Sequence, residues 1–317
     1  MRRYAMVLPL VSSFIAAHAQ VMANMNYSHE LQHAESLLAG TTISDIAHHV
    51  HYDLKLYDRD GHESTATYDI YRAPLLYTRV EAKAGDYTLT FIRSEREKKE
   101  WQQYTGIKPL KLFDFEQAMD RPTIAINRFS QELDRVQEMD PGQLDGAPLL
   151  CANDQGGTSI CFNPLLHLFA YAQMFNQTVM YDQWLPIGAH TVPGSIRIYQ
   201  DKKLLVEATG TVEAVKTFPP DFMRIPATPT KPEPMAEHKV VHTKPIDMTQ
   251  AIAGGIQLAV SVDEKGRVKK AEVIDSDDKK TEGMARKAAR GLVFEPKMEN
   301  GQPVPFDTVL YLEYYPW

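Results

Sequence analysis

Apolar and polar side chains alternate with a period of two over much of residues 50–93. Such alternation is typical of strands that are buried on one face and wet on the other. Turn residues at 58–61 (DRDG) and 85–86 (GD) divide the stretch, so it predicts an antiparallel meander. The predicted strands are 50–56, 66–70, 75–84 and 87–93, and their inward side chains include Val50, Tyr52, Leu54, Leu56, Ala66, Tyr68, Ile70, Tyr87, Leu89 and Phe91.

Helical spacing of apolar residues is confined to shorter stretches of the first two thirds of the chain. The pattern predicts a helix over 28–38, where Gly40 follows as a stop signal. Together with the strands, these elements predict an α+β domain, a curved antiparallel sheet with helices on one face. Further helices are predicted over 110–119, 130–139 and 164–175, and further strands over 194–200 and 203–218, joined by a turn at Asp201 and Lys202.

The texture changes over 218–248, which holds seven prolines and little periodicity. Proline favours extended backbone without a packed core, so this stretch is predicted to be a semi-rigid linker. Period-two alternation then returns from Ile256 to Val262. The remaining pattern predicts a turn at 263–266, a strand at 267–275, a helix at 281–294 and a last strand at 307–315, in the order β-β-α-β.

The first twenty residues have the layout of a secretory signal. Arg2 and Arg3 precede an apolar run, and Ala17 and Ala19 are small residues at the positions that a signal peptidase reads. The run has about 13 residues, whereas a membrane-spanning helix needs roughly 20. We expect cleavage after Ala19 and export to the periplasm, with an uncleaved membrane anchor as the alternative. The predicted organisation is a signal at 1–19, a curved-sheet domain at 20–217, a linker at 218–248 and a C-terminal domain at 249–317.

Charge and cysteine content narrow the function classes. The formal net charge of −7, without basic blocks, argues against nucleic acid and anionic membrane surfaces as partners. The two cysteines, Cys151 and Cys161, flank the turn sequence NDQGGT. In an exported chain such a pair is expected to oxidise, so the sequence predicts a disulfide across a hairpin.

Candidate catalytic and metal-binding motifs are weak. The chain has no Gly-x-Ser-x-Gly elbow and no glycine-rich loop before a helix. His48, His49 and His51 lie close together, with His29 and His33 upstream. On a strand His49 and His51 share a face while His48 points away, and no carboxylate is obviously aimed at them. We therefore expect a solvated start of a strand, with no metal, no cofactor and no enzymatic activity.

The last 64 residues, 254–317, resemble the C-terminal domain of the TonB family. One departure from the family is the segment HTKPIDMTQAIAG, which stands where a tyrosine–proline pair and a short helix usually precede the first strand. The residues that carry the resemblance are Gly255, Val260, Val262, Asp263, Gly266, Val268, Val273 and Ser276, followed by Phe294, Pro296, Gly301, Pro303 and Val304.

The TonB resemblance implies that an extended peptide of an outer-membrane, receptor-like partner adds to the last strand of the domain. The implied binding residues are Val309, Leu310, Tyr311, Leu312 and Glu313. The expected function is thus that of an exported adaptor that docks to an envelope protein, with a link to outer-membrane transport.

The first half is also similar, more faintly, to lipoprotein-carrier folds of the LolA, LolB and RseB type. That resemblance implies a lipid or acyl ligand in the concave face of the sheet, so a carrier is one alternative function. A true energy transducer with an uncleaved anchor is the other. The short apolar start, and a linker that follows a folded domain instead of an anchor, argue against force transmission.

Overall fold

The computed structural model describes most of the chain downstream of the predicted signal. Residues 1–45, which hold that signal and the predicted helix at 28–38, lie outside the described part. Within it, no helix combines the length and the apolar character needed to cross a membrane. The described residues are 46–73, 77–132, 139–144, 147–153, 158–163, 168–174, 176–219, 221–226, 240–242 and 254–314.

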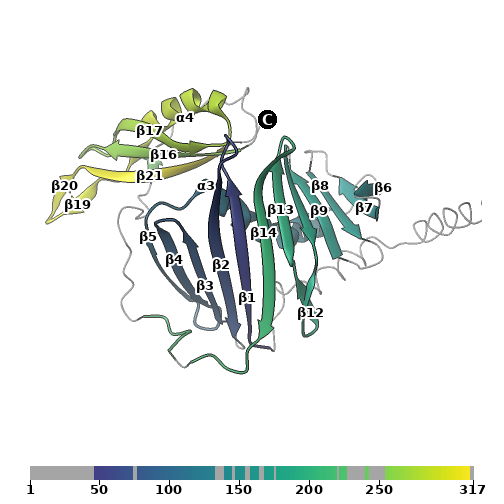
Figure 1. The fold of residues 1–317 in the computed structure, drawn as a ribbon. Helices are drawn as coiled ribbons and strands as arrows, with labels where there is room; N and C mark the ends of the chain where they lie inside the picture. Colours follow the sequence, from purple (N-terminus) through teal and green to yellow (C-terminus); the bar gives the residue numbers. More distant parts are fainter. Residues whose placement is uncertain are drawn as a thin grey trace, which may run out of the picture.

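One large antiparallel sheet is built from strands between residues 48 and 214, and we call this part of the structure the first domain (Figure 1). Its strand order is β5-β4-β3-β2-β1-β14-β13-β10-β9-β8-β7-β6, so β1 and β14 join two consecutive meanders. A separate short hairpin consists of β11 (Leu185–Ile187) and β12 (His190–Val192). The strands of the sheet are β1 His48–Tyr57, β2 Glu63–Ala73, β3 Tyr77–Ala84, β4 Tyr87–Ser94, β5 Lys99–Thr105, β6 Met139–Leu144, β7 Ala147–Asn153, β8 Thr158–Asn163, β9 Leu168–Met174, β10 Gln177–Asp182, β13 Ser195–Gln200 and β14 Lys203–Ala214.

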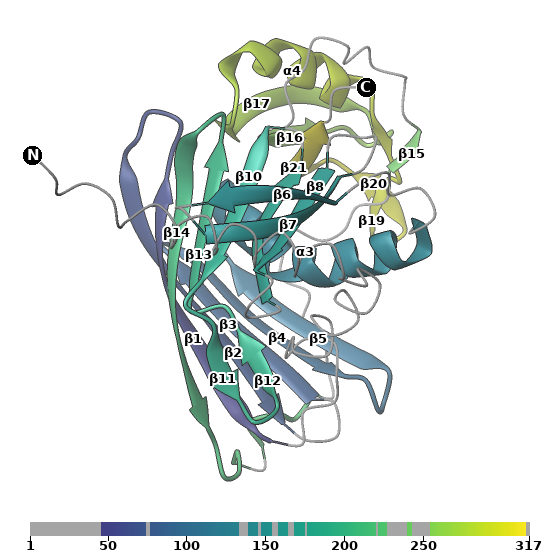
Figure 2. The same cartoon turned by 90° about the vertical axis from the view of Figure 1, so that its right-hand side faces the viewer.

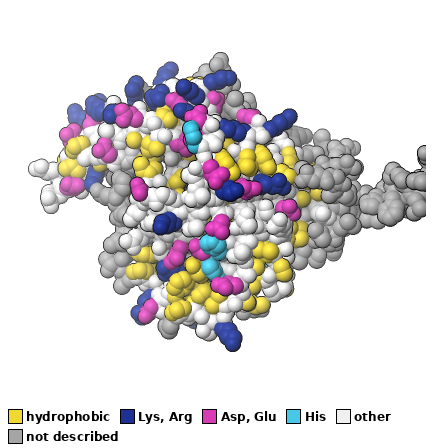
Figure 3. Space-filling model, viewed as in Figure 1, with side chains coloured by type: hydrophobic (Ala, Val, Ile, Leu, Met, Phe, Trp, Pro, Cys, Tyr) yellow, Lys and Arg dark blue, Asp and Glu magenta, His cyan; other side chains and the backbone are white. Residues whose placement is uncertain are grey.

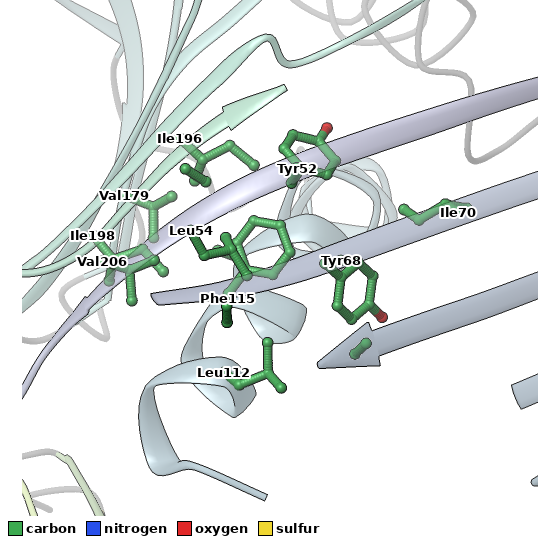
Figure 4. Close-up of a cluster of buried hydrophobic side chains, with 14 of the residues drawn as sticks. Tyr52, Leu54, Tyr68, Ile70, Leu112, Phe115, Val179, Ile196, Ile198 and Val206 are labelled. Carbon is green, nitrogen blue, oxygen red and sulfur yellow. The ribbon is translucent and has the colours of Figure 1, made fainter. Parts of the chain in front are cut away.

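The sheet bends around the long helix α3 (Leu110–Glu132) (Figure 2). Phe115 of α3 sits between two sheet tyrosines, with 5.3 Å from its ring centroid to that of Tyr52 and 5.3 Å to that of Tyr68. Figure 4 shows these side chains among the aliphatic residues of both meanders. The concave face of the sheet is therefore packed against α3, and we call the opposite face the outer face.

The strands predicted from alternation are confirmed. β1 shows the expected alternation of buried and more exposed side chains. The predicted turn at Asp201 and Lys202 joins β13 to β14, and both residues have positive φ angles, 49° and 69°. Two consecutive positive φ angles match the twist of a tight hairpin.

One predicted helix is wrong and another is longer than predicted. The helix predicted over 110–119 is the first part of α3. The apolar run 164–175, predicted as a helix, contains β9, which pairs with β8 and β10. A short, continuously apolar run suits a buried strand as well as a helix, and neighbouring strands decide between them. Of the helix predicted over 130–139, the first three residues are the end of α3 and residue 139 begins β6, while 133–138 lie outside the described residues.

The C-terminal domain is a three-stranded antiparallel sheet of order β17-β16-β21 with α4 on one face. Its element order agrees with the predicted β-β-α-β pattern, with short strands inserted before the last long one. Its elements are β16 Gly254–Val262, β17 Val268–Ser276, the 3₁₀ turn η2 Lys279–Thr281, α4 Glu282–Arg290, β18 Val293–Phe294, β19 Lys297–Glu299, β20 Gln302–Val304 and β21 Phe306–Tyr314.

Described parts of the predicted linker touch both domains. Phe218 and Phe222 pack against Tyr71 on the outer face of the first sheet, with centroid distances of 6.0 Å and 4.8 Å. Near the other end, β15 (Val240–His242) pairs with β18 of the C-terminal domain. The boundaries of the linker stay a prediction, but its described residues are anchored at both ends.

Candidate functional site

The last strand, β21, forms one edge of the C-terminal sheet. It pairs with β16 on one side, and no strand of the described chain pairs with its other side. Val309, Leu310, Tyr311 and Leu312 are half-buried. All five residues of the predicted binding segment, including Glu313, therefore lie on an edge strand, the structure that strand addition requires. Binding there stays a prediction.

Two hydrogen bonds establish which backbone groups of β21 point outward. The Gly255 N–H donates to Asp277 Oδ2 (2.7 Å), and the Gly255 carbonyl accepts from the Asp277 N–H (3.1 Å), so Gly255 faces the β17 side. Because consecutive residues of a strand point their backbone groups in opposite directions, Ile256 faces β21 and its partner Leu312.

The same alternation continues along the ladder. Leu258 lies opposite Leu310, so the backbone groups of Leu310 also point inward to β16. Those of Val309 point to the outer side of the edge. An edge strand whose outward N–H and C=O groups are available is a template for another strand.

The two faces of β21 are buried by different partners. Leu310 and Leu312 pack into the core beneath α4. Tyr311 points the other way, and its ring lies 4.1 Å, centroid to centroid, from Phe113 of α3. Figure 1 shows β21 on the side of its sheet that is nearer to the first domain. The predicted binding strand is thus also part of a contact between the two domains.

Close packing at this contact depends on Gly255. A Cβ atom on Gly255 would lie 2.7 Å from the Tyr311 hydroxyl and 2.8 Å from Cδ1 of Leu110. Real Cβ atoms do not approach other atoms so closely, so a side chain at this position would have to displace the Tyr311 hydroxyl and the buried Leu110 methyl group. Next to it, the buried Gln257 side chain donates from Nε2 to the carbonyl of Lys108 (2.6 Å).

A buried ion pair also links the domains. Lys111 of α3 donates from Nζ to Asp277 Oδ1, and Asp114 Oδ2 lies 3.7 Å from the same ammonium. Burial would lower the pKa of Lys111, but the nearby carboxylates of Asp114 and Asp277 outweigh it, so this pKa is raised. Lys111 is therefore charged where Asp277 meets it.

For the carboxyl group of Asp114, burial determines the direction of the pKa shift. Its burial raises the pKa of the carboxyl to about 7, although Lys111 acts in the opposing direction. At a second point of the contact, Arg59 donates one hydrogen bond to Ser276 Oγ (3.2 Å) and another to Glu282 Oε1. The bond from Arg59 lowers the pKa of Glu282. The domain contact is polar at several points, which local sequence patterns do not reveal.

The predicted disulfide is confirmed. Cys151 and Cys161 face one another across β7 and β8 and are bonded, with their Cα atoms 4.0 Å apart. Both strands belong to the first sheet, so the bond is part of the scaffold of that domain.

The histidines of β1 differ from the prediction in one respect. As expected, His49 and His51 share the outer face while His48 is buried. The expectation that no carboxylate is aimed at them is wrong, because Asp69 Oδ1 lies 2.7 Å from His49 Nε2 and 2.8 Å from His51 Nδ1. Asp69 lies directly opposite His51 in the β1–β2 hairpin, so the register of that hairpin was the signal that would have found it.

Comparison with known families supports the C-terminal assignment. Residues 246–316 match the family model described as the C-terminal part of the Gram-negative bacterial TonB protein. This confirms the resemblance drawn from the glycine, valine and proline pattern, and TonB C-terminal domains are associated with the cell envelope. No curated protein matches the chain.

Solved structures are similar to the chain over about three fifths of its length. A DUF1329 family protein from Desulfovibrio piger is 7% identical, with a TM-score of 0.40, and the match covers 62% of this chain and 95% of that one. A domain described as belonging to an outer-membrane lipoprotein-sorting protein from Vibrio parahaemolyticus is 6% identical, with a TM-score of 0.38 and coverage of 61% and 94%. A LolA superfamily protein from Nitrosomonas europaea is 9% identical, with a TM-score of 0.31 and coverage of 63% and 98%. The descriptions of the second and third neighbours name the carrier class that the first half of the chain was expected to resemble.

Proposed function

We propose that the protein is a non-enzymatic adaptor of the cell envelope that binds an extended segment of a partner protein along the outer edge of β21. The observation that carries the proposal is the position of β21 at the edge of its sheet, with the backbone groups of Val309 directed outward. Main-chain hydrogen bonds supply affinity in this binding mode, and pockets for alternate side chains supply specificity. The family match of residues 246–316 supports the same mode.

Export and partner class belong to the same proposal. A cleaved signal would place both domains in the periplasm, where an outer-membrane, receptor-like protein can present an extended segment. The Cys151–Cys161 disulfide of the first domain suits that oxidising compartment. The first domain would then hold the TonB-like domain in a fixed orientation through α3.

A lipid carrier is supported less well. A carrier would hold an acyl chain on the concave face of the first sheet, but Leu112, Phe115 and Ala118 of α3 are fully buried against that face. An acyl chain could enter there only if α3 moved away, at the cost of the apolar burial these residues provide.

A photo-crosslinking experiment in cells tests the adaptor proposal. A photoreactive phenylalanine derivative replaces Asp307, an exposed residue of β21, or Lys269, an exposed residue of β17 at the opposite edge of the sheet. We expect a defined adduct with one envelope protein from position 307 and none from position 269. Equal adducts from both positions would contradict strand addition at β21.

Two proline substitutions make the experiment specific for the backbone. Val309→Pro removes an outward N–H, which a binding partner needs, and proline is tolerated on edge strands. Leu310→Pro removes an inward N–H that pairs with β16, so it is expected to unfold the domain. The adduct should disappear in Val309→Pro while circular dichroism and the melting temperature stay near those of the wild type. An undiminished adduct in folded Val309→Pro would exclude the proposal.

A further inference from the structure

The outer face of the first sheet carries a group of residues that the adaptor function does not use. We call His49, His51, Asp69 and Glu213 the histidine cluster. They come from three neighbouring strands, since His51 lies opposite Asp69 on β2 and His49 lies opposite Glu213 on β14. Figure 3 shows histidine and acidic side chains gathered near the middle of this face.

The two imidazole rings converge on one oxygen atom. His49 Nε2 and His51 Nδ1 lie 2.7 Å and 2.8 Å from Asp69 Oδ1. The other ring nitrogen of each histidine lies near a different carboxylate, with 3.1 Å from His49 Nδ1 to Glu213 Oε1 and 3.3 Å from His51 Nε2 to Asp53 Oδ1. A histidine that ligates a metal almost always has this arrangement, one nitrogen toward the metal and the other hydrogen-bonded to a carboxylate or carbonyl.

The scaffold around the cluster fixes the rings. The imidazole of His49 stacks on the ring of Tyr71, with centroids 4.3 Å apart and an interplanar angle of 8°. Phe218 and Phe222 in turn pack against Tyr71. The side chains of His49, His51 and Asp69 are 19%, 33% and 18% exposed, so the cluster is held in place yet reachable from solvent.

The donor atoms fit a small tetrahedral ion after a small adjustment. Bonds of about 2.0 Å to a tetrahedral Zn²⁺ place two donor atoms about 3.3 Å apart. The two histidine–Asp69 separations are shorter by about half an ångström, as expected for hydrogen-bonded atoms, and all three ligand atoms lie within 4.8 Å of one another. Rotation of the Asp69 carboxylate would widen the two short separations. Two neutral imidazoles with three carboxylates nearby also give the negative charge that a divalent cation needs.

We propose that His49 Nε2, His51 Nδ1 and the Asp69 carboxylate bind a divalent transition-metal ion. Glu213 and Asp53 orient the rings, and a water molecule or an exogenous ligand takes the fourth position. Two nitrogens and one oxygen suit Zn²⁺, Cu²⁺ or Ni²⁺, whereas Ca²⁺ and Mg²⁺ select sites built of oxygen alone.

Zinc binding to the purified full chain, stripped of metal with a chelator, tests this site. Isothermal titration in competition with a zinc-binding dye should give one tight site per chain. The double variant His49→Gln/His51→Gln should weaken binding at least 100-fold, and Asp69→Asn should weaken it strongly. Glu213→Ala, which removes an orienting group, should weaken it about 10- to 100-fold.

A second histidine–carboxylate group in the same hairpin provides the matched control. Asp58, Asp60 and His62 also lie close together, in the β1–β2 turn, but His62 and Asp60 are exposed. His62→Gln should leave zinc affinity unchanged. Loss of the tight site in His62→Gln, or its retention in a folded His49→Gln/His51→Gln variant, would overturn the proposal.

Cobalt substitution gives a readout of geometry that does not depend on affinity. Co²⁺ bound by two imidazoles, a carboxylate and one further ligand should show the intense visible absorption of a tetrahedral ion, and this absorption should vanish in Asp69→Asn. A weak, octahedral-type spectrum in the wild type would show that the cluster is only a hydrogen-bonded surface feature. Circular dichroism confirms that each variant is folded.

Discussion

The two sheets of the protein each pack one face against a helix, but they differ in what covers the other face. The second face of the C-terminal sheet lies against the first domain, where Gln257 and Lys111 are buried. The outer face of the first sheet keeps its histidines and acidic residues partly exposed. Burial of polar groups is expensive unless they are paired, so similar charged side chains have different energetic weights on the two faces.

The polar groups of the two faces also differ in their expected roles. At the domain contact the polar groups are nearly all satisfied by one another, and their role is to hold α3 on β16. On the outer face the histidine cluster is satisfied internally but open to solvent. The four predictions below test how strongly the two faces differ.

The largest effect is expected for Lys111→Ala at the domain contact. The substitution leaves Asp277 buried without its cation, and breaking a buried ion pair in this way costs about 3–5 kcal/mol of unfolding free energy. Urea denaturation of the full chain measures the loss. The double variant Lys111→Met/Asp277→Asn removes both charges but keeps an oxygen acceptor for the Gly255 N–H, so it should recover much of the loss. A double variant as unstable as the single one would contradict the ion-pair explanation.

A pH-dependent effect is expected from Asp114. Because burial raises the pKa of its carboxyl to about 7 from a usual value near 4, the folded protein holds a proton that the unfolded chain has lost in this range. Stability therefore falls as the pH rises from about 4 to about 7, by at most about 1.4 kcal/mol per pH unit from this group.

The variant Asp114→Asn isolates that contribution. It cannot ionise, so its stability relative to the wild type should improve as the pH rises through this window. Urea unfolding of both proteins at pH 5, 6 and 7 measures the difference. A stability difference that is the same at all three pH values would mean that Asp114 has the same pKa in the folded and unfolded states.

A third prediction compares two glycines of the C-terminal domain. Gly255→Ala places a Cβ atom against Tyr311 and Leu110, and overpacking of this kind costs about 1–3 kcal/mol. A Cβ atom on Gly283 of α4 meets nothing within 4 Å, so Gly283→Ala should instead stabilise by roughly 0.5–1 kcal/mol. Thermal melting of both variants measures the opposite signs, and equal shifts would show that the domain contact does not constrain Gly255.

Much of the fold followed from local pattern, but the contacts between distant residues did not. Alternation found β1 to β4, β13, β14 and the C-terminal strands, because each has one buried face. The run that contains β9 is almost continuously apolar and shows no alternation, so the sequence could not distinguish a helix from a strand there. The last strand, which is predicted to bind a partner, was located correctly as a strand, whereas its edge position depends on pairing.

Long-range partners lay beyond any local signal. Lys111 and Asp277 are 166 residues apart, and nothing in the sequence near either one indicates the other. Asp69 is different, because it is only 18 residues from His51 in a hairpin whose turn was predicted. Counting outward from a four-residue turn at 58–61 would pair His51 with Tyr68, and the extra loop residue His62 shifts the register by one to Asp69. The predicted turn therefore indicates the neighbourhood of Asp69 but not its exact position.

The smallest effect is expected for an ion pair on the outer face. Lys55 Nζ and Glu207 Oε2 lie 3.5 Å apart across β1 and β14, with about half of the lysine side chain exposed. Water and salt screen such a pair, and ordering two long side chains offsets most of its attraction. Lys55→Ala should therefore leave the urea midpoint unchanged, whereas Lys111→Ala shifts it strongly. Because the same lysine-to-alanine change is made at both sites, the difference between the two urea midpoints reports the effect of burial on an ion pair. Equal shifts would mean that water reaches the domain contact and that the two faces do not differ as proposed.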